Sequence, residues 1–291
     1  MNEQVCTTGV ERCDGAAGVD AGGYPVEATG NAVLDILEHR SSTRAFARDD
    51  GDRPVAVTDE QRAAILHAAS RAPSAGAMMM YSIVSIREQA TLDRLADLCD
   101  HQPMITKSPW ALIFVVDYAK WIDLFEHVGC FDPEFVERTG KAPRRAPGLG
   151  DFAIAAQDAV IAAQNAVVAA EALGLGSCYI GDIVENAEEV AALLDLPHYT
   201  MPLSMLIIGT PRKERPAIAH PVVNLVHEER YRRADAATMD AQVAEMDAMF
   251  RPHAHEVGER VVDIYTRKHT SPFMAEMSRS MEWWFKNWLG K

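Results

Sequence analysis

The feature that most constrains the fold is a long and almost wholly apolar segment at residues 151–173. A helix that is apolar over most of its circumference must be buried on most sides. Gly174 is placed to end it. We therefore expect a central helix that packs on a sheet and against a partner subunit, with a core helix of a monomer as the alternative. Its larger polar residues recur about every seven positions and make one narrow stripe: Gln157, Asp158, Gln164, Asn165 and Glu171.

Three short segments are predicted to be β-strands: residues 81–86, 110–117 and 203–210. The second and third are apolar on both faces. Strands of this kind belong in the middle of a sheet that is covered on both sides.

Two amphipathic helices are expected before these strands. Asn31 is a candidate N-cap, whose side chain would accept hydrogen bonds from the first free N–H groups of a helix running to Glu38. Thr58 and Gln61 form a capping box at the start of a second helix, which Pro73 stops.

Charge and cysteine content exclude several classes of protein. The 291 residues carry 42 acidic and 28 basic side chains, which argues against a general nucleic-acid binder and against adhesion to anionic membranes. The most apolar stretch is interrupted by polar residues, so we expect no membrane span, and the N-terminus has no secretory pattern. Five scattered cysteines without CxxC favour a reducing cytoplasm. A redox sensor built on Cys6 and Cys13 is a weaker alternative.

Both ends of the chain differ from its centre. Residues 1–26 are rich in Gly, Ala and small polar residues and are predicted to be a disordered tail, which leaves 27–291 as a single domain. An acidic amphipathic helix is expected over residues 235–250. Three tryptophans and two phenylalanines follow near the C-terminus, and they must be buried against this chain or against a second copy.

The stretch EHRSSTRAF suggests an anion clamp. Arg40 and Arg44 lie four residues apart around Ser41, Ser42 and Thr43. Guanidinium groups match phosphate oxygens in geometry, and serine adds a donor hydroxyl. The alternative is a solvated helix end.

Two further segments suggest a site for a flat ligand. In RAPSAGAMMMYS, Ser74, Ala75 and Gly76 let the backbone approach closely, and the methionines at 78–80 are soft enough to line an aromatic ring. The alternative is a plain helix-to-strand connector with core methionines. In EALGLGSCYIGDI, backbone N–H groups around Gly181 and Asp182 are free to bind a carbonyl-bearing heterocycle.

Several motifs are absent from the sequence. The glycines of the last segment do not form GxGxxG after a strand, and there is no Walker loop, HExxH, GxSxG or nucleophile–base pair. His253 and His255 lack a further ligand set, so no metal site is predicted.

In this order, the segments resemble the FMN-dependent nitroreductase family, and most closely its NADPH-preferring, oxygen-insensitive nitroreductase and flavin reductase group. The resemblance runs from about residue 31 to 231 and is carried by HRSSTRAF, AAQNAVVAAEALGLGSCYIGDI, LLDLPHYTMPLSMLIIGTP and NLVHEERY. It implies an α+β fold, a nitroreductase-like antiparallel central sheet flanked by helices. It also implies an intertwined homodimer in which the C-terminal extension, about 232–291, wraps the partner.

The resemblance also implies which residues bind FMN. The clamp would hold the phosphate and ribityl chain, the two other segments would lie along the flavin ring, and one amide in HQP would contact the flavin. The cofactor-binding residues implied are His39, Arg40, Ser41, Ser42, Arg44, Ser74, Ala75, Gly76, Gln102, Tyr179, Ile180, Gly181, Asp182 and Arg215.

Two departures from the family pattern matter. Ala77 or its neighbours replace an asparagine, so one polar contact to the ring is lost. Ala217-Ile218-Ala219 stands where the group has Lys-Pro-Arg. Each lost charge-assisted hydrogen bond is worth about 1.5–3 kcal/mol. Cations nearby could replace them: Arg212, Lys213, Arg215 and His220.

The resemblance implies a flavin-dependent enzyme that moves two electrons from NAD(P)H through FMN to a nitroaromatic, quinone or flavin acceptor by a ping-pong mechanism. No catalytic side chain is required, because the flavin carries the chemistry. The alternative, motivated by Ala217-Ile218-Ala219, is a flavin carrier, or a flavin reductase that holds FMN weakly.

Overall fold

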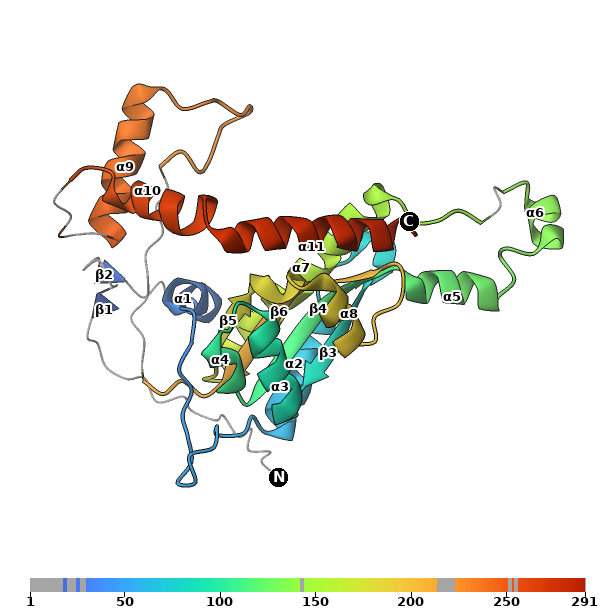
Figure 1. Cartoon of the computed structure of the whole chain (residues 1–291), viewed down its shortest axis with the longest axis horizontal. Helices are drawn as coiled ribbons and strands as arrows, with labels where there is room; N and C mark the ends of the chain where they lie inside the picture. Colours follow the sequence, from blue (N-terminus) through green and yellow to red (C-terminus); the bar gives the residue numbers. More distant parts are fainter. Residues whose placement is uncertain are drawn as a thin grey trace, which may run out of the picture.

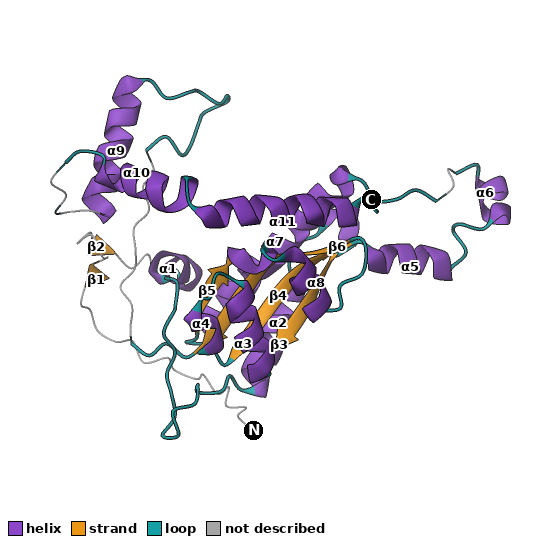
Figure 2. Cartoon of the chain, viewed as in Figure 1, coloured by secondary structure: helices purple, strands orange, loops and turns teal. Residues whose placement is uncertain are grey.

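The computed structural model describes residues 18–19, 25–26, 30–141, 144–213, 223–250, 253 and 256–290. Within them the protein has the predicted α+β fold, in which helices flank a four-stranded sheet (Figure 1, Figure 2). The strand order is β3-β4-β6-β5, and all neighbouring strands are antiparallel. The strands are β3 (Tyr81–Ile86), β4 (Trp110–Asp117), β5 (Gly176–Ile180) and β6 (Thr200–Gly209).

The bounds of β3 and β4 are those predicted from the sequence, whereas β6 differs. It begins at Thr200 rather than Leu203, because Thr200 pairs with Asp117 at the end of β4. It ends one residue early, at Gly209, opposite the first residue of β5.

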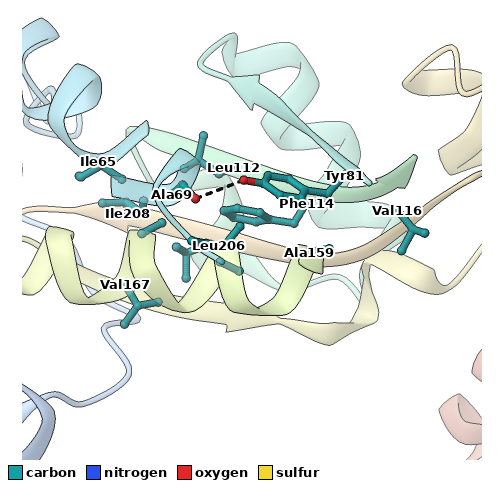
Figure 3. Packing of buried hydrophobic residues seen from close by; sticks show 14 of the residues in the cluster. Ile65, Ala69, Tyr81, Leu112, Phe114, Val116, Ala159, Val167, Leu206 and Ile208 are labelled. Atoms are coloured by element: carbon teal, nitrogen blue, oxygen red, sulfur yellow. Dashed lines mark hydrogen bonds between the residues drawn. The ribbon is translucent and has the colours of Figure 1, made fainter. Parts of the chain in front are cut away.

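The two faces of the sheet support two separate cores. All eight residues of β4 are buried. Leu112 and Phe114 enter the core on one face (Figure 3), and Ile113 and Val115 enter the core on the other, as the period of two in a strand requires. The first core contains α2 (Asp59–Ser70) and α7 (Leu149–Ala172), and the second contains α3 (Gln89–Leu98), α4 (Pro103–Thr106), α8 (Ala187–Leu193) and most of α11 (Pro272–Trp288).

Helix α7 is the predicted central helix. Six of its eight buried residues are alanines, which let the helix lie close to the sheet. The helix is also long and apolar enough to cross a membrane, but here it packs on the sheet as a core helix does. Its opposite side leaves Ile154, Val160 and Ile161 exposed.

The predicted helix starts are confirmed. At α1 (Ala32–His39), the Asn31 side chain accepts hydrogen bonds from the N–H groups of Val33 (3.0 Å) and Leu34 (3.2 Å). At α2, Thr58 and Gln61 make both hydrogen bonds of the capping box, at 3.1 and 3.2 Å. Helix α2 ends at Ser70, before Pro73.

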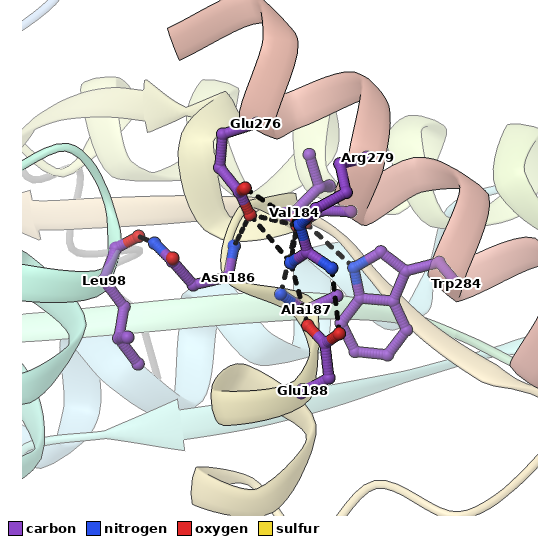
Figure 4. Close-up of polar contacts among 9 residues, drawn as sticks. Leu98, Val184, Asn186, Ala187, Glu188, Glu276, Arg279 and Trp284 are labelled. Atoms are coloured by element: carbon purple, nitrogen blue, oxygen red, sulfur yellow. Dashed lines mark hydrogen bonds and ion pairs between the residues drawn. The ribbon is translucent and has the colours of Figure 1, made fainter.

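The C-terminal aromatic residues are buried by their own chain. Trp284 and Trp288 have no exposed surface, and their indole N–H groups donate to the carbonyls of Val184 (2.9 Å) and Gly148 (3.1 Å). Arg279 adds a two-point contact to Glu188 at the start of α8, at 2.8 Å each (Figure 4). Helix α11 thus packs on its own chain. The predicted wrapping of a partner by the C-terminal extension, about residues 232–291, stays a prediction.

The remaining elements lie at the periphery. Helices α5 (Ala119–His127) and α6 (Pro133–Thr139) extend beyond one end of the sheet, and α9 (Ala236–Phe250) and α10 (Glu259–Ile264) lie beyond the other (Figure 1). A π-helical turn, Tyr265–His269, joins α10 to α11. Strands β1 (Gly18–Val19) and β2 (Pro25–Val26) pair with each other. The rest of the predicted N-terminal tail, with Cys6 and Cys13, lies outside the described residues.

Candidate functional site

The segment after α1 runs along the β5 edge of the sheet. Ser42 forms a parallel bridge with Ser177, and the Thr43 N–H donates to the Ser177 carbonyl at 2.7 Å. Farther along, the Ala47 N–H donates to the carbonyl of Thr210 at 2.8 Å. The backbone of the predicted clamp is therefore held by the sheet itself.

Gly176 allows the clamp segment to lie very close to β5. A Cβ at Gly176 would lie 2.1 Å from the hydroxyl oxygen of Thr43, which is far inside van der Waals contact. Thr43 is buried between the clamp segment and β5. No other residue at position 176 would let the segment lie where it does.

Arg40 carries an unsatisfied donor. Its Nε is buried and has no hydrogen-bond partner among the described residues, and the same is true of Oε1 of Glu171 in α7. Partial burial raises the pKa of Glu171 and raises that of the Tyr179 phenol to about 12, and the positive charge of Arg40 opposes both shifts. The Tyr179 hydroxyl donates to Oε1 of Gln164 at 3.3 Å. A ligand that brings acceptor oxygens would satisfy Arg40.

The other residues predicted to bind the phosphate and ribityl chain are neighbours of Arg40 in the sequence. Nδ1 of His39 lies 2.7 Å from the Asp35 carbonyl oxygen, so this ring edge is occupied by its own helix and Nε2 remains for a ligand. Ser41 and Ser42 are half-buried.

The predicted small-residue loop is strained and held from α7. Ser74 precedes the 3₁₀ turn η1 (Ala75–Ala77), in which Gly76 has φ +57° and Ala77 φ +56°. The buried carboxylate of Asp158 accepts hydrogen bonds from the N–H groups of Ala75 (2.9 Å) and Met80 (3.2 Å). The sequence predicted Asp158 only as one member of a polar stripe. Its neighbours in the sequence give no sign that it anchors a loop.

Two of the three methionines at positions 78–80 fit a plain connector with core methionines, and one fits the lining of a ligand site. Met80 is buried in the core and Met78 packs against that core, as in a plain connector. Met79 is 37% exposed and has φ +49°, and of the three it has the side chain most accessible to a ligand.

Gln102 and the end of β5 come together in the structure. The Gln102 amide donates a hydrogen bond to the carboxylate of Asp182, whose pKa is raised, mainly by burial. The Ile180 side chain is buried, so it offers a ligand only its backbone. A Cβ at Gly181 would meet no atom within 4 Å, so open space adjoins this backbone.

Arg44 has different neighbours from Arg40. It lines a cavity of about 530 Å³ together with Lys107 and Arg212. Lys107 was missed from the sequence, because nothing in its own segment marks it as part of a site. Arg215, Ala217-Ile218-Ala219 and His220 lie outside the described residues. In the described part of the chain, no three His, Cys, Asp or Glu side chains are grouped to hold a metal ion.

Comparison with known families identifies this arrangement. A model of the Nitroreductase family matches residues 37–210. The chain belongs to the nitroreductase family. It is 31% identical over 215 residues to the FMN reductase (NAD(P)H) of Bacillus subtilis strain 168, covering 73% of this chain and 79% of that protein. It is 32% identical over 219 residues to the oxygen-insensitive NADPH nitroreductase of Salmonella typhimurium, covering 73% and 81%.

Solved structures agree with the family assignment. The NADPH:FMN oxidoreductase of Vibrio harveyi, complexed with NAD+, aligns with a TM-score of 0.66 and 25% identity over 86% of this chain and 97% of that one. The B. megaterium protein NfrA2 aligns with a TM-score of 0.68 and 26% identity over the same shares of the two chains. The predicted nitroreductase-like fold is therefore confirmed.

The described residues fit FMN. The unsatisfied Arg40 donor suits a phosphate or ribityl oxygen, and the open backbone at Gly181 suits the edge of a flat ring. The strained loop beginning at Ser74 supplies a surface without large side chains.

Proposed function

We propose that the protein is an NAD(P)H-dependent FMN oxidoreductase that delivers two electrons to a nitroaromatic, quinone or flavin acceptor. One observation carries this proposal: the buried Arg40 Nε has no partner among the described residues. Arg40 lies near Tyr179 of β5, and β5 leads to the open backbone of Gly181. A hydrogen-bond donor for an anion thus lies close to an accessible backbone surface, and a flavin mononucleotide requires both.

The FMN contacts fall into two groups. His39, Arg40, Ser41, Ser42 and Arg44 would bind the phosphate and ribityl chain, with Arg215 as a further cation. The ring would lie against backbone and small side chains. This second group consists of Ser74, Ala75, Gly76, Gln102, Tyr179, Ile180, Gly181 and Asp182.

The protein would contribute to the chemistry by orienting the cofactor and by stabilising charge on it. FMN, when bound, accepts a hydride from NAD(P)H and returns two electrons to the acceptor. The cationic side chains near the clamp would stabilise negative charge on the cofactor. Tyr179 keeps its proton at neutral pH, because burial raises its pKa to about 12, and so it adds no negative charge beside the cofactor. The Gln102 amide would hold Asp182 in place.

Donor and acceptor would use the same open surface in turn. The open space beside Gly181 and the exposed Met79 support an accessible face of the ring. A ping-pong order follows, because NAD(P)+ must leave before the acceptor can enter. Parallel lines in double-reciprocal plots would support it, and intersecting lines would contradict it.

A second copy of the chain is the proposed partner. Helix α7 exposes Ile154, Val160 and Ile161 on the side away from the sheet, and the neighbouring α1 exposes Val33 and Leu34. Apolar patches of this kind mark interfaces. A homodimer would cover them, and elution from a sizing column as a single chain would contradict it.

The proposed location is the cytoplasm. Among the described residues Cys99, Cys130 and Cys178 are free thiols, as a reducing compartment allows. The other proposed partners are small-molecule donors and acceptors, with no role for nucleic acid or a membrane surface.

The alternative is a flavin carrier, or a flavin reductase that uses FMN as a substrate. Its support is the missing cations at Ala217-Ile218-Ala219. Steady-state assays with free FMN, a nitroarene and a quinone separate the two. Turnover of the nitroarene or quinone by protein with bound FMN favours the oxidoreductase, and turnover of free FMN alone favours the alternative.

The direct test is the absorption spectrum of the purified protein, followed by anaerobic titration with NADPH. We expect a flavin band that bleaches with one equivalent of NADPH per flavin. Arg40→Gln should weaken FMN binding about tenfold or more through loss of a charge-assisted hydrogen bond, while Arg138→Gln on the distant α6 should not. A protein that stays colourless in excess FMN would overturn the proposal.

A further inference from the structure

A cavity of about 380 Å³ is lined by residues of α5, of α6 and of the segment that precedes α7. It belongs to the part of the chain that extends beyond one end of the sheet (Figure 1). Most of its lining side chains carry an aromatic ring: Tyr118, Phe125, Phe131 and Phe135. Among the described residues no carboxylate lines it. Its volume lies within the range of small-molecule sites.

The cavity has a buried part and an accessible part. Tyr118 and Ile122 are buried and belong to the core that contains α2 and α7. The three lining phenylalanines are half-buried, and Phe131 packs against that same core. A molecule from solvent could therefore enter and lie against the rings.

Backbone hydrogen bonds fix the lining of the cavity. The Tyr118 N–H donates to the Tyr199 carbonyl at 3.0 Å, just before α5 begins. The Cys130 N–H donates to the Phe125 carbonyl at 2.8 Å in the turn after α5. The rings of Phe125 and Phe131 meet edge to face, with their centroids 6.2 Å apart. Because these positions are set without any ligand, little ordering is needed for a molecule to bind.

One cationic side chain, Arg145, lines the cavity, and it is already neutralised. It makes a two-point ion pair with Asp151 of α7, at 2.7 and 2.9 Å. These hydrogen bonds hold the pKa of Asp151 below its ordinary value, so the carboxylate stays ionised at neutral pH. Tyr118 keeps its proton there, because burial raises the pKa of its phenol. An ion entering the cavity would lose its hydration without gaining a free counter-charge, which favours a neutral ligand.

We propose that this cavity binds a small neutral aromatic molecule, which packs against the rings of Phe125, Phe131 and Phe135. Aromatic rings gain from offset and edge-to-face contacts with one another, in addition to the burial of apolar surface. The inference is independent of the proposed function, because none of the lining residues belongs to the predicted flavin contacts.

The probe is 2-naphthol, which is neutral at neutral pH, titrated into the full chain by calorimetry. We expect saturable binding with a Kd of about 1 mM or tighter. The anion 2-naphthoate has the same rings and should bind about tenfold more weakly. Equally tight binding of 2-naphthoate would contradict a neutral ligand, and no saturable binding of 2-naphthol would overturn the proposal.

Two variants change the cavity in opposite directions. Phe131→Ala removes one ring, and Cys130→Leu fills part of the space. Both should raise the Kd for 2-naphthol about tenfold, whereas Phe273→Ala, at a half-buried phenylalanine of α11, should not change it. Circular dichroism melting curves show which variants are folded. An unchanged Kd in the folded cavity variants would place the probe elsewhere and overturn the proposal.

Cys130 gives a local readout in the wild-type chain. Its thiol is free, half-buried and part of the cavity lining. Alkylation by N-ethylmaleimide is followed by mass spectrometry of peptides, which separates Cys130 from the other four cysteines. By mass action, 2-naphthol at a concentration equal to its Kd should halve the alkylation rate at Cys130 and leave the other rates unchanged. Alkylation of Cys130 at the same rate with and without 2-naphthol would contradict binding in this cavity.

Discussion

Asp158 of α7 accepts a hydrogen bond from the backbone N–H of Ala75, 83 residues earlier in the chain, at 2.9 Å. Its second oxygen accepts from the N–H of Met80. Between these two contacts the loop contains Gly76, Ala77 and Met79, all at positive φ. Non-glycine residues in that region cost energy, so the surrounding structure must hold them. One buried carboxylate thus holds both ends of the loop proposed to lie at the flavin edge.

Asp158→Asn should loosen this loop. The amide can accept through one oxygen only, which leaves one backbone N–H without its acceptor. We expect the free energy of unfolding to fall by about 1–3 kcal/mol, measured by urea denaturation, and the Kd for FMN to rise. Gln157→Ala, at the exposed neighbouring position, is the control and should change neither. An unchanged urea midpoint in Asp158→Asn would show that the loop holds itself.

Gly176→Ala should displace the clamp segment. The new methyl group would lie 2.1 Å from the Thr43 hydroxyl oxygen, so the segment must move away from β5. We expect weaker FMN binding and a lower thermal midpoint, and the double variant Gly176→Ala with Thr43→Gly should recover part of the loss. Gly150→Ala is the matched control, because a Cβ there meets nothing within 4 Å. Equal FMN affinity in Gly176→Ala and the wild type would refute the role given to this glycine.

Glu185 should make stability depend on pH. Burial, together with the negative charges of Asp182, Asp100 and Glu276, raises its pKa to about 7, and Lys268 opposes the shift. Between the ordinary pKa of 4.5 for a glutamate and about 7, the folded state therefore binds the proton that the unfolded state has lost. Stability falls as pH rises through this window, since the native state binds more protons there.

Glu185→Gln should remove the loss of stability that accompanies ionisation of this buried carboxyl. We expect it to raise the free energy of unfolding by about 1–3 kcal/mol at pH 8 and to have little effect at pH 4.5. Urea midpoints of the variant and the wild type at the two pH values measure the difference. Glu282→Gln, exposed on α11, is the control. A stabilisation of equal size at both pH values would contradict the assignment to this carboxyl.

Trp284→Ala should strongly destabilise the subunit. The side chain is fully buried, and its indole N–H bonds the Val184 carbonyl. Removing a buried indole costs about 3–5 kcal/mol, and Trp283→Ala, at the half-buried neighbour, should cost less. Chemical denaturation measures both. If Trp284→Ala dissociated a dimer without lowering subunit stability, α11 would pack on the partner and not on its own chain.

Features encoded within one segment were predictable from the sequence. The capping box of Thr58 and Gln61 needs only neighbours three residues apart, and the runs that became β3 and β4 are marked by their apolar composition. The family motifs, from HRSSTRAF to NLVHEERY, allowed the fold and the class of chemistry to be inferred, because their order along the chain is specific.

Features that join distant segments were not predictable in this way. A polar stripe on α7 does not reveal that Asp158 anchors a loop or that Asn165 donates to the Ala68 carbonyl at 3.1 Å. Three further features also depend on distant segments. They are the Arg40 Nε, which has no partner among the described residues, the grouping of Lys107 and Arg212 with Arg44, and the burial of Trp284 by its own chain.

The sequence by itself determined the secondary structure of the core, the family and the kind of ligand, because periodicity, caps and motifs act over a few neighbouring residues. Only the tertiary structure decided which polar groups are satisfied, which are left for a ligand, and where Arg40 and Arg44 lie. The reason is physical: a hydrogen bond or an ion pair depends on distances of a few ångströms between side chains, and the packing of α7 and the clamp segment against the sheet sets those distances.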